Sequence, residues 1–318
     1  MPLPTDEKAL NLSKDLLHAL DNLAGGEHPG FRPVHAKGVM LTGTFTPAPD
    51  AASLTSAPHM QANPTPVTVR LSDFAGIPTV PDNDPQGASP RGCAIRFHLG
   101  EHVHTDIVSH SVDSFPTRTA EEFLEFARTI AATDFAGPHP NAFEQYLGAH
   151  PKALAFVQLP KPIPTSLAKE SYFAVNAFKF TDAKGTSRFV RYRVLPVEKN
   201  EYLDENAAAG KTPNFLFEEI ADRVAQGPVK FKLVVQLAEQ GDTVDDATVR
   251  WPEDRKLVTL GEISLTTRVP DNDEEARRII FDPIPRVDGI ESSGDPLLQP
   301  RADVYLLSGR RRRAATQK

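Results

Sequence analysis

Two short segments carry side chains whose types and spacing could do chemistry. "GFRPVHAKG" at residues 30–38 places Arg32 and His35 three residues apart, and a neutral histidine can accept and release a proton near neutral pH. "RADVY" at residues 301–305 places Arg301 and Tyr305 four residues apart, which is one helical turn. A guanidinium at that position favours the phenolate, and a phenolate is a hard ligand suited to ferric iron. Taken alone, each pattern also fits an ordinary polar turn or a surface Arg–Tyr stack.

The remaining pattern predicts the elements that hold these side chains. Residues 5–24 have the leucine spacing of an amphipathic helix, with Thr5 able to cap it, Asp6 and Glu7 in its first turn, and Gly25 ending it. The period then changes to two in short segments bounded by Gly or Pro, which predicts strands at 38–45, 66–72, 92–99, 103–109, 172–180, 188–195 and 229–237. Helices are predicted at 119–132, with a Thr119/Glu122 capping box, and at 141–149 and 214–226.

These elements predict an α+β fold with an antiparallel β-barrel core and surrounding helices. We expect one domain over residues 1–318: an N-terminal helix at 1–25, the barrel with inserted helices at 26–270, a wrapping segment at 271–294 and a final helix at 295–313. In the final helix Asp295 is the predicted N-cap, Pro296 follows at the first helical position, and Pro300 should bend the helix slightly.

Strand alternation assigns side chains to faces. In "PVTVRLS", Val67, Val69 and Leu71 point one way, and Thr68, Arg70 and Ser72 point the other. In "GCAIRFHL", Cys93, Ile95, Phe97 and Leu99 oppose Ala94, Arg96 and His98. Because burying an unpaired arginine is very costly, Arg70 should either meet solvent or lie inside the barrel beside an anion.

Composition narrows the class of protein. The chain has 318 residues, 40% of them apolar and 24% charged, with a net charge of −7 and a pI near 5.8, which fits a globular protein without a nucleic-acid or membrane partner. No run of 18 apolar residues occurs, and the acidic start lacks an apolar signal region. The single cysteine, Cys93, excludes an internal disulfide and fits a reducing compartment, so we expect a cytoplasmic location.

A second metal chemistry is also conceivable. "FHLGEHVHTD" holds His98, His102 and His104 with Glu101, which are residue types that bind zinc or non-haem iron. A solvated hairpin is the favoured interpretation of this segment. No Gly-rich phosphate loop and no Ser-His-Asp signature is present.

Several separate segments together resemble the haem catalases. The resemblance covers nearly the whole chain in the family's order, through "RPVHAKG" (32–38), "TPVTVRLSDFAG" (65–76), "SPRGCAIRFH" (89–98), "TDIVSHSVDSF" (105–115), "VRWP" (249–252) and "RADVY" (301–305). On this resemblance we expect a shortened form of the family's N-terminal arm and no further C-terminal domain, as in the compact catalase-related peroxidases.

This resemblance implies a haem b cofactor and a role for each matching residue. His35 would be the distal acid and base, Ser72 would hydrogen-bond it, and Tyr305 would be the iron ligand, held as phenolate by Arg301. The residues that would meet the haem propionates are Arg32, Arg70 and Arg312. Those that would line the haem pocket are Val34, Phe115 and Phe123.

One position departs from the family. Where catalases carry a distal asparagine, "TDIVSHS" places His110, which is bulkier and can titrate, so efficient dismutation of hydrogen peroxide is in doubt. The resemblance therefore implies a peroxidase that reduces hydrogen peroxide or organic hydroperoxides with a small organic donor. Assembly as a homo-oligomer is a further expectation. The alternatives are a true catalase, a hydroperoxide isomerase of the allene oxide synthase kind, and a β-barrel binding module without a redox role.

Overall fold

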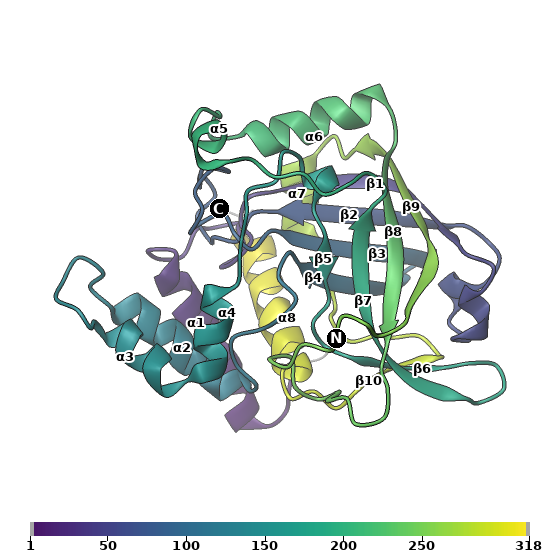
Figure 1. Ribbon diagram of the computed structural model, residues 1–318, viewed down its shortest axis with the longest axis horizontal. Coiled ribbons are helices and arrows are strands. Elements are labelled where there is room, and N and C mark those ends of the chain that lie inside the picture. The colour runs from purple at the N-terminus through teal and green to yellow at the C-terminus, as the bar shows by residue number, and fades with distance from the viewer. Residues whose placement is uncertain (1–2, 316–318) are drawn as a thin grey trace.

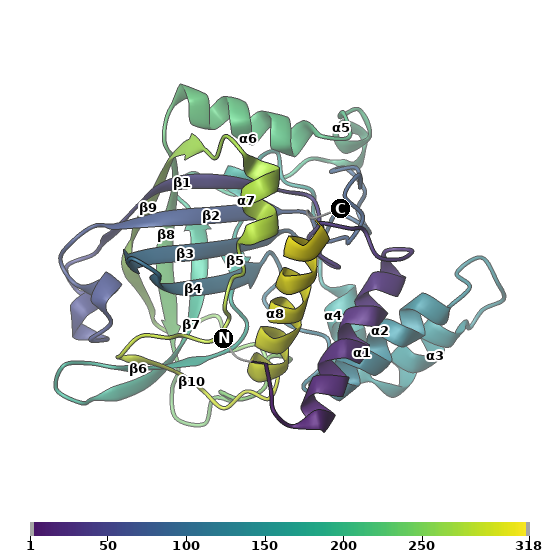
Figure 2. The ribbon, with the colours of Figure 1, turned by 180° about the vertical axis from the view of Figure 1, so that it is seen from behind.

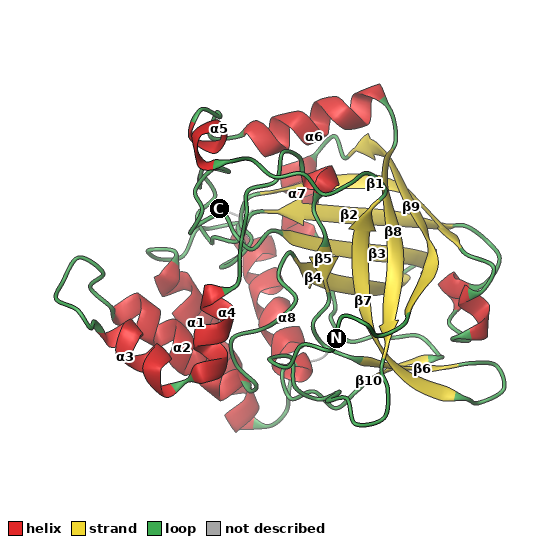
Figure 3. Cartoon of the chain, viewed as in Figure 1, coloured by secondary structure: helices red, strands yellow, loops and turns green. Residues whose placement is uncertain are grey.

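An antiparallel β-barrel forms the centre of the computed structural model, which describes residues 3–315 (Figures 1 and 3). Its strands are β1 (Gly38–Pro47), β2 (Thr65–Ser72), β3 (Gly92–Gly100), β4 (Val103–His110), β5 (Tyr172–Phe173), β7 (Ser187–Pro196), β8 (Val229–Leu237) and β9 (Leu257–Arg268). They follow the order β7-β5-β4-β3-β2-β1-β9-β8, and the pairing of β7 with β8 closes the barrel. Strands β6 (Phe178–Thr181) and β10 (Ile290–Ser292) extend the sheet beside β7.

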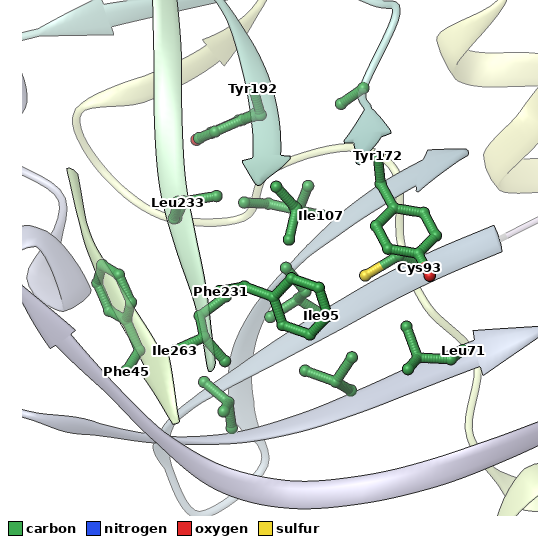
Figure 4. Packing of buried hydrophobic residues seen from close by; sticks show 14 of the residues in the cluster. Phe45, Leu71, Cys93, Ile95, Ile107, Tyr172, Tyr192, Phe231, Leu233 and Ile263 are labelled. Carbon is green, nitrogen blue, oxygen red and sulfur yellow. The ribbon is translucent and has the colours of Figure 1, made fainter. Parts of the chain in front are cut away.

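The barrel closes around inward-facing apolar side chains from every wall (Figure 4). Val67, Val69 and Leu71 from β2 meet Cys93 and Ile95 from β3 in this core, so the predicted alternation is confirmed. Burial raises the pKa of Cys93 to about 12, and its thiol is therefore protonated and inert, as expected from its place in a strand.

Helices cover the barrel on two sides (Figures 1 and 2). A helical layer consists of α1 (Glu7–Leu23), α2 (Ala120–Ala132), α3 (Ala142–Ala149) and α4 (Pro151–Gln158), and α8 (Leu298–Ala314) stands between this layer and the barrel. On another side lie α5 (Glu205–Ala209) and α6 (Phe215–Gln226), and α7 (Asn272–Arg278) contacts both β1 and α8. No helix in residues 3–315 is long and apolar enough to cross a bilayer.

Helix starts show where capping was predicted well and where it was not. The Thr119/Glu122 capping box of α2 is present. In α1 the N-cap is Asp6 rather than Thr5, because the Asp6 carboxylate accepts the Ala9 N–H at 3.0 Å. The predicted N-cap of the final helix was wrong, since α8 begins after Leu297, and Asp295 instead caps the preceding turn by accepting the Leu297 N–H at 2.9 Å.

The later start of α8 also changes the expectation for Pro300. Pro300 is the third helical residue, and the N–H groups of the first turn have no acceptor within the helix. The ring therefore removes no helical hydrogen bond, and the predicted bend does not follow.

Some elements between 172 and 294 were missed. The predicted strand at 172–180 is broken into β5 and β6, and the expected wrapping segment at 271–294 contains α7 and β10. The twelve-residue β9 was not predicted, although it pairs with both β1 and β8. Gly261 interrupts its apolar pattern at a point where a Cβ would collide with Thr46 and Phe45, so a packing requirement weakens the sequence signal.

Candidate active site

A row of paired residues crosses the outer face of the barrel. Gly38, Ser72, Gly92 and His110 lie opposite one another on β1, β2, β3 and β4 in turn. Side chains at directly paired positions of neighbouring strands share a face. Ser72 and His110 are thereby placed on either side of Gly92, which leaves a gap between them.

His35 fills that gap. Its backbone N–H donates to the Phe74 carbonyl at 2.6 Å, its φ is 58° in the left-handed region, and its ring lies edge-on to Phe74 with centroids 5.7 Å apart. A Cβ at Gly92 would come within 2.8 Å of His35 Nδ1 and 2.9 Å of Cε1. Only glycine at position 92 lets the imidazole lie against the strand. We call His35, Ser72, Gly92 and His110 the distal wall.

The hydrogen bonds of His35 fix its protonation. Nδ1 lies 2.8 Å from the Asp73 carbonyl oxygen and 3.1 Å from Ser72 Oγ. A carbonyl can only accept, so Nδ1 carries the hydrogen and Nε2 keeps its lone pair. Burial, followed by the charge of Arg70, lowers the pKa of His35 to about 3. His35 is therefore a neutral base whose Nε2 has no hydrogen-bond partner in the described chain.

His110 has the opposite tautomer. Its Nδ1 accepts the Val112 backbone N–H at 3.3 Å, so the hydrogen of the neutral ring is on Nε2. Burial, followed by the charges of Arg301 and His35, lowers the pKa of His110 to about 3. The distal wall thus combines an Nε2 acceptor on His35 with an Nε2–H donor on His110.

The facing side of the site comes from α8. Arg301 Nη2 donates to the Tyr305 hydroxyl at 3.3 Å, and the guanidinium carbon lies 5.8 Å from the ring centroid. Arg301 Nη1 donates to Asn176 Oδ1, and Asn176 Nδ2 donates to Asp295 Oδ2 at 2.8 Å. We call Arg301, Tyr305 and Asn176 the proximal wall. The Arg–Tyr pair lies one turn apart on a helix, as the spacing predicted.

Three arginines gather beside the two walls, and none of them has a carboxylate partner within residues 3–315. Arg32 and Arg312 both donate to the Ile279 carbonyl, at 3.2 and 2.9 Å, and Arg70 donates to the Ala36 carbonyl at 3.1 Å. Buried Nε atoms of Arg70 and Arg312 have no partner in the described residues. Gly38 leaves room for the Arg70 guanidinium, which a Cβ there would strike.

A bound anion would stabilise the positive charges of this arginine cluster. Burial, then the charge of Arg312, lowers the pKa of Arg70 to about 9, and burial, then Arg32, lowers the pKa of Arg312 to about 8. Mutual repulsion in a buried place is costly unless negative charge is supplied. The two propionates of a haem are anions of the required kind, so these residues fit the group that the sequence resemblance implies.

Arg70 itself departs from both sequence expectations. It is neither solvent-exposed nor inside the barrel: it lies on the outer face of β2 and is only 3% exposed. The charges of Arg312 on α8 and Asp273 on α7 act on its pKa, which shows that these helices cover the outer face. The barrel interior is instead filled by the apolar side chains of Figure 4.

Charge interactions show that the two walls face the same region. Besides burial, the charge of Arg301 on the proximal wall lowers the pKa of both His35 and His110. Burial and the charge of Arg70 lower the pKa of Arg32, and the charge of Tyr305 partly opposes that shift. Such effects require groups within electrostatic range in a poorly solvated place. The structure therefore brings together the predicted acid–base histidine, a hydrogen-bond donor, the predicted iron ligand and the three arginines predicted to bind an anion.

The three predicted pocket-lining residues lie next to this assembly. Val34 and Phe123 pack against one apolar cluster that includes Val304 of α8. Phe115 packs against Leu297 just before α8, and its ring lies 5.1 Å from that of Phe123. Among the described residues no hydrogen bond or ring contact joins them to His35 or Tyr305.

The zinc or non-haem iron alternative does not assemble in residues 3–315, where no group of three or more His, Cys, Asp or Glu could hold a metal ion. His98 Nε2 lies 2.9 Å from Thr68 Oγ1, and His102 is an exposed turn residue with a φ of 59°. His104 Nε2 lies 3.9 Å from Asp106 Oδ2.

Sequence reasoning missed three residues that shape the site. Gly92 could have been found as a glycine inside a strand, a usual mark of close approach. Asn176, at the break between β5 and β6, and Asp73, directly after β2, had no local signal. Their partners lie far along the chain, at Arg301 for Asn176 and at His35 for the Asp73 carbonyl.

Comparison with known proteins adds an independent observation. A family model described as catalase matches residues 19–317. A protein of Mycolicibacterium paratuberculosis named catalase-related peroxidase is 34% identical over 89% of this chain and 90% of its own length. A protein of Synechococcus elongatus with the same name is 31% identical over 89% of this chain and 84% of its own length.

Solved structures share the fold. A fungal catalase superposes with a TM-score of 0.79 at 21% identity, covering 92% of this chain and 62% of its own. A bacterial catalase gives a TM-score of 0.78 at 23% identity, covering 90% of this chain and 58% of its own. This chain thus spans about six tenths of the length of either structure.

Proposed function

Because this chain belongs to the catalase family, we propose that it is a haem-dependent peroxidase that reduces hydrogen peroxide or organic hydroperoxides with a small organic donor. The observation that carries the proposal is the pairing of a neutral His35 with an Arg301–Tyr305 helix across one buried, arginine-lined region. The names of the two similar catalase-related peroxidases support the same activity.

We propose that five residues described above would hold a haem b. Tyr305 would ligate the iron, Arg301 would stabilise its phenolate, and the arginine cluster of Arg32, Arg70 and Arg312 would bind the propionates. When bound, the haem supplies the redox chemistry that cleaves the peroxide O–O bond. The protein sets the axial ligand and the proton chemistry around it.

The distal wall performs the proton transfer. His35 Nε2 accepts the proton from one peroxide oxygen and returns it to the other, which converts a poor leaving group into water or an alcohol. Nδ1–H remains bound to the Asp73 carbonyl at 2.8 Å, so the ring keeps its orientation while Nε2 changes protonation.

His110 is proposed to hold the substrate. Its Nε2–H can donate to a peroxide oxygen while His35 accepts from the other, and the Val112 N–H fixes the ring that presents it. An imidazole is larger than the asparagine side chain of catalases, so it leaves less room for a second peroxide molecule. This favours an organic donor as the reductant over dismutation.

The spectrum of the purified, haem-supplemented protein tests the proposal. We expect a Soret band of the tyrosinate-ligated type that changes on addition of peroxide and returns when a phenolic donor is added. Failure to take up haem, despite ample supply, would overturn the proposal in favour of a binding module.

Product analysis separates the related activities. We expect peroxide consumption to depend on donor concentration, with little oxygen evolved. Oxygen released in a ratio of one to two peroxides without donor would make the protein a catalase. An epoxide formed from a lipid hydroperoxide by loss of one water, with no donor present, would make it an enzyme of the allene oxide synthase kind.

The cellular setting belongs to the same proposal. A cytoplasmic location is supported by a single cysteine, which suits a reducing compartment. Assembly as a homo-oligomer is also proposed. Sedimentation of the purified protein and fractionation of its source cells would test the two statements.

A further inference from the structure

A closed circuit of buried charges lies behind His35. Lys37, two residues after His35, donates to Asp82 Oδ1. The Asp82 carbonyl accepts from Arg91 Nη2, and Arg91 Nη1 pairs with Asp73 Oδ1. The Asp73 carbonyl then accepts the His35 Nδ1–H at 2.8 Å. We call Lys37, Asp82, Arg91 and Asp73 the charge circuit, which begins and ends in the His35 segment.

The charge circuit is buried and is hydrogen-bonded to its surroundings through Asp82 and Lys37. The side chains of Asp73, Asp82 and Arg91 are fully buried. Asp82 Oδ2 accepts the Leu216 N–H of α6 at 2.7 Å, and Lys37 Nζ donates to the Val80 and Pro213 carbonyls at 2.9 and 3.0 Å. Paired buried charges of this kind tolerate little displacement, because a lost partner leaves an uncompensated charge.

His35 needs such a support. A φ of 58° is unfavourable for a residue with a Cβ and persists where the surroundings over-determine it. The backbone bond from the Asp73 N–H to the Lys37 carbonyl, at 3.2 Å, ties together the two ends of the charge circuit. A shift of Asp73 would therefore move both the backbone of the His35 segment and the acceptor of its Nδ1–H.

We propose that the charge circuit is the positioning device of the distal histidine, with Asp73 and Arg91 as its central positioning residues. Asp73 connects the two functions: its carboxylate is fixed by Arg91, and its carbonyl fixes the tautomer of His35. The catalytic consequence of this inference rests on the proposed function, while the tautomer of His35 can be measured without turnover.

The first experiment uses Asp73→Asn in the full-length, haem-loaded protein. Hydrogen cyanide must give its proton to a base when it binds ferric haem, so its association rate reports on His35 apart from turnover. We expect this rate to fall by about 10- to 100-fold, as misplacement of a catalytic group typically costs. The matched control is Asp242→Asn, which breaks the Asp242–Arg255 pair in the β8–β9 loop and should leave the rate unchanged.

A double variant separates positioning from stability. Asp73→Leu with Arg91→Met removes both buried charges, so the denaturation midpoint should recover toward that of the wild type. We expect cyanide association to remain slow, because the carbonyl at position 73 is no longer tethered. Full recovery of the rate together with stability would overturn the inference, as would a wild-type rate in Asp73→Asn.

The tautomer gives a readout that does not need haem iron. In the full chain with ¹⁵N-labelled histidine and diamagnetic zinc porphyrin, His35 should show one neutral form with hydrogen on Nδ1, and Asp73→Asn should show a mixture. A single unchanged tautomer in the variant would contradict the inference alone. Lack of porphyrin binding by the wild type would overturn the proposed function, and the same spectra of the porphyrin-free chain would still decide the inference.

Discussion

The proximal and distal walls of the site are built in different ways. The proximal pair, Arg301 and Tyr305, stands on one helix, and its spacing alone places the guanidinium beside the hydroxyl. The distal wall is assembled from strands β2, β3 and β4 and from a loop in left-handed conformation, with Gly92 as the gap that His35 occupies. The helix supplies geometry from local spacing, whereas the distal wall depends on sheet register.

This difference predicts how each wall responds to substitutions. On α8 a side chain can change while its neighbour keeps its position, since the helix backbone holds both. In the distal wall every contact of His35 comes from another segment, so a small shift in one strand reaches the imidazole. We therefore expect proximal substitutions to remove one chemical group, and distal ones to disturb several positions together.

The largest expected effect is on the proximal wall. Tyr305→Phe removes the only hydroxyl that Arg301 contacts on α8, so the tyrosinate-type haem spectrum should be lost while the fold is kept. Absorption and circular dichroism spectra measure the two properties. Tyr202→Phe, on an exposed residue, should bind haem like the wild type, and an unchanged spectrum for Tyr305→Phe would contradict the ligand assignment.

The next effect is on the distal base. His35→Ala should keep haem but slow peroxide cleavage by about 100- to 10,000-fold, the usual contribution of a positioned acid–base group. Stopped-flow mixing with peroxide measures this rate. His18→Ala, at an exposed position of α1, is the control, and full activity of His35→Ala would show that another group moves the proton.

Gly92→Ala tests the idea that the distal wall depends on sheet register. The new methyl group would lie 2.5 Å from Ser72 Oγ and 2.8 Å from His35 Nδ1, so we expect displacement of the imidazole, a loss of about 10- to 100-fold in rate, and a stability cost of about 1–3 kcal/mol. Gly148→Ala, where a Cβ meets nothing within 4 Å, should be neutral. Equal behaviour of the two variants would remove the distinction between the walls.

The last prediction concerns stability alone and a buried histidine outside the candidate site. His59 is 1% exposed, its two ring nitrogens have no hydrogen-bond partner among the described residues, and burial lowers its pKa to about 4. Because the folded-state pKa lies below the unfolded value, the unfolded chain gains the proton first, and the free energy of unfolding falls as pH drops from about 6.5 toward 4.

Removal of the His59 imidazole should weaken the dependence of the unfolding free energy on pH in the acid range. His59→Leu should reduce the loss of unfolding free energy between pH 7 and pH 4 by about 3 kcal/mol, measured by urea denaturation at both pH values. His102→Asn, at a side chain that is 94% exposed, should not alter the loss. An identical pH dependence in wild type and His59→Leu would show that His59 finds a partner in solution.

Local patterns predicted the parts of the fold whose causes are local. The capping box of α2, the two faces of β2 and the Arg301–Tyr305 turn follow from neighbours within a few residues. Strand β9 was missed because Gly261, which interrupts its apolar pattern, is required by close contacts with Phe45 and Thr46 on β1. The position of Arg70 was missed because alternation gives the face of a strand but not what covers it.

The site shows the same division. The family resemblance pointed to His35, Tyr305 and the arginines. The structure brings these residues to one region. Asp73 and Asn176 could not be found in this way, because each is defined by a partner far along the chain. Tautomers, likewise, come from hydrogen bonds that no spacing in the sequence encodes.

The alternating side-chain directions of β3 affect how well the protein resists oxidation by its own substrate. Cys93 follows Gly92 directly, yet its thiol points into the barrel, while the site lies on the opposite face. Peroxide oxidises the thiolate rather than the thiol, and burial raises the pKa of Cys93 to about 12. Met60 also lies in the barrel core. The sheet that carries the site thus separates peroxide from the sulfur atoms of Cys93 and Met60.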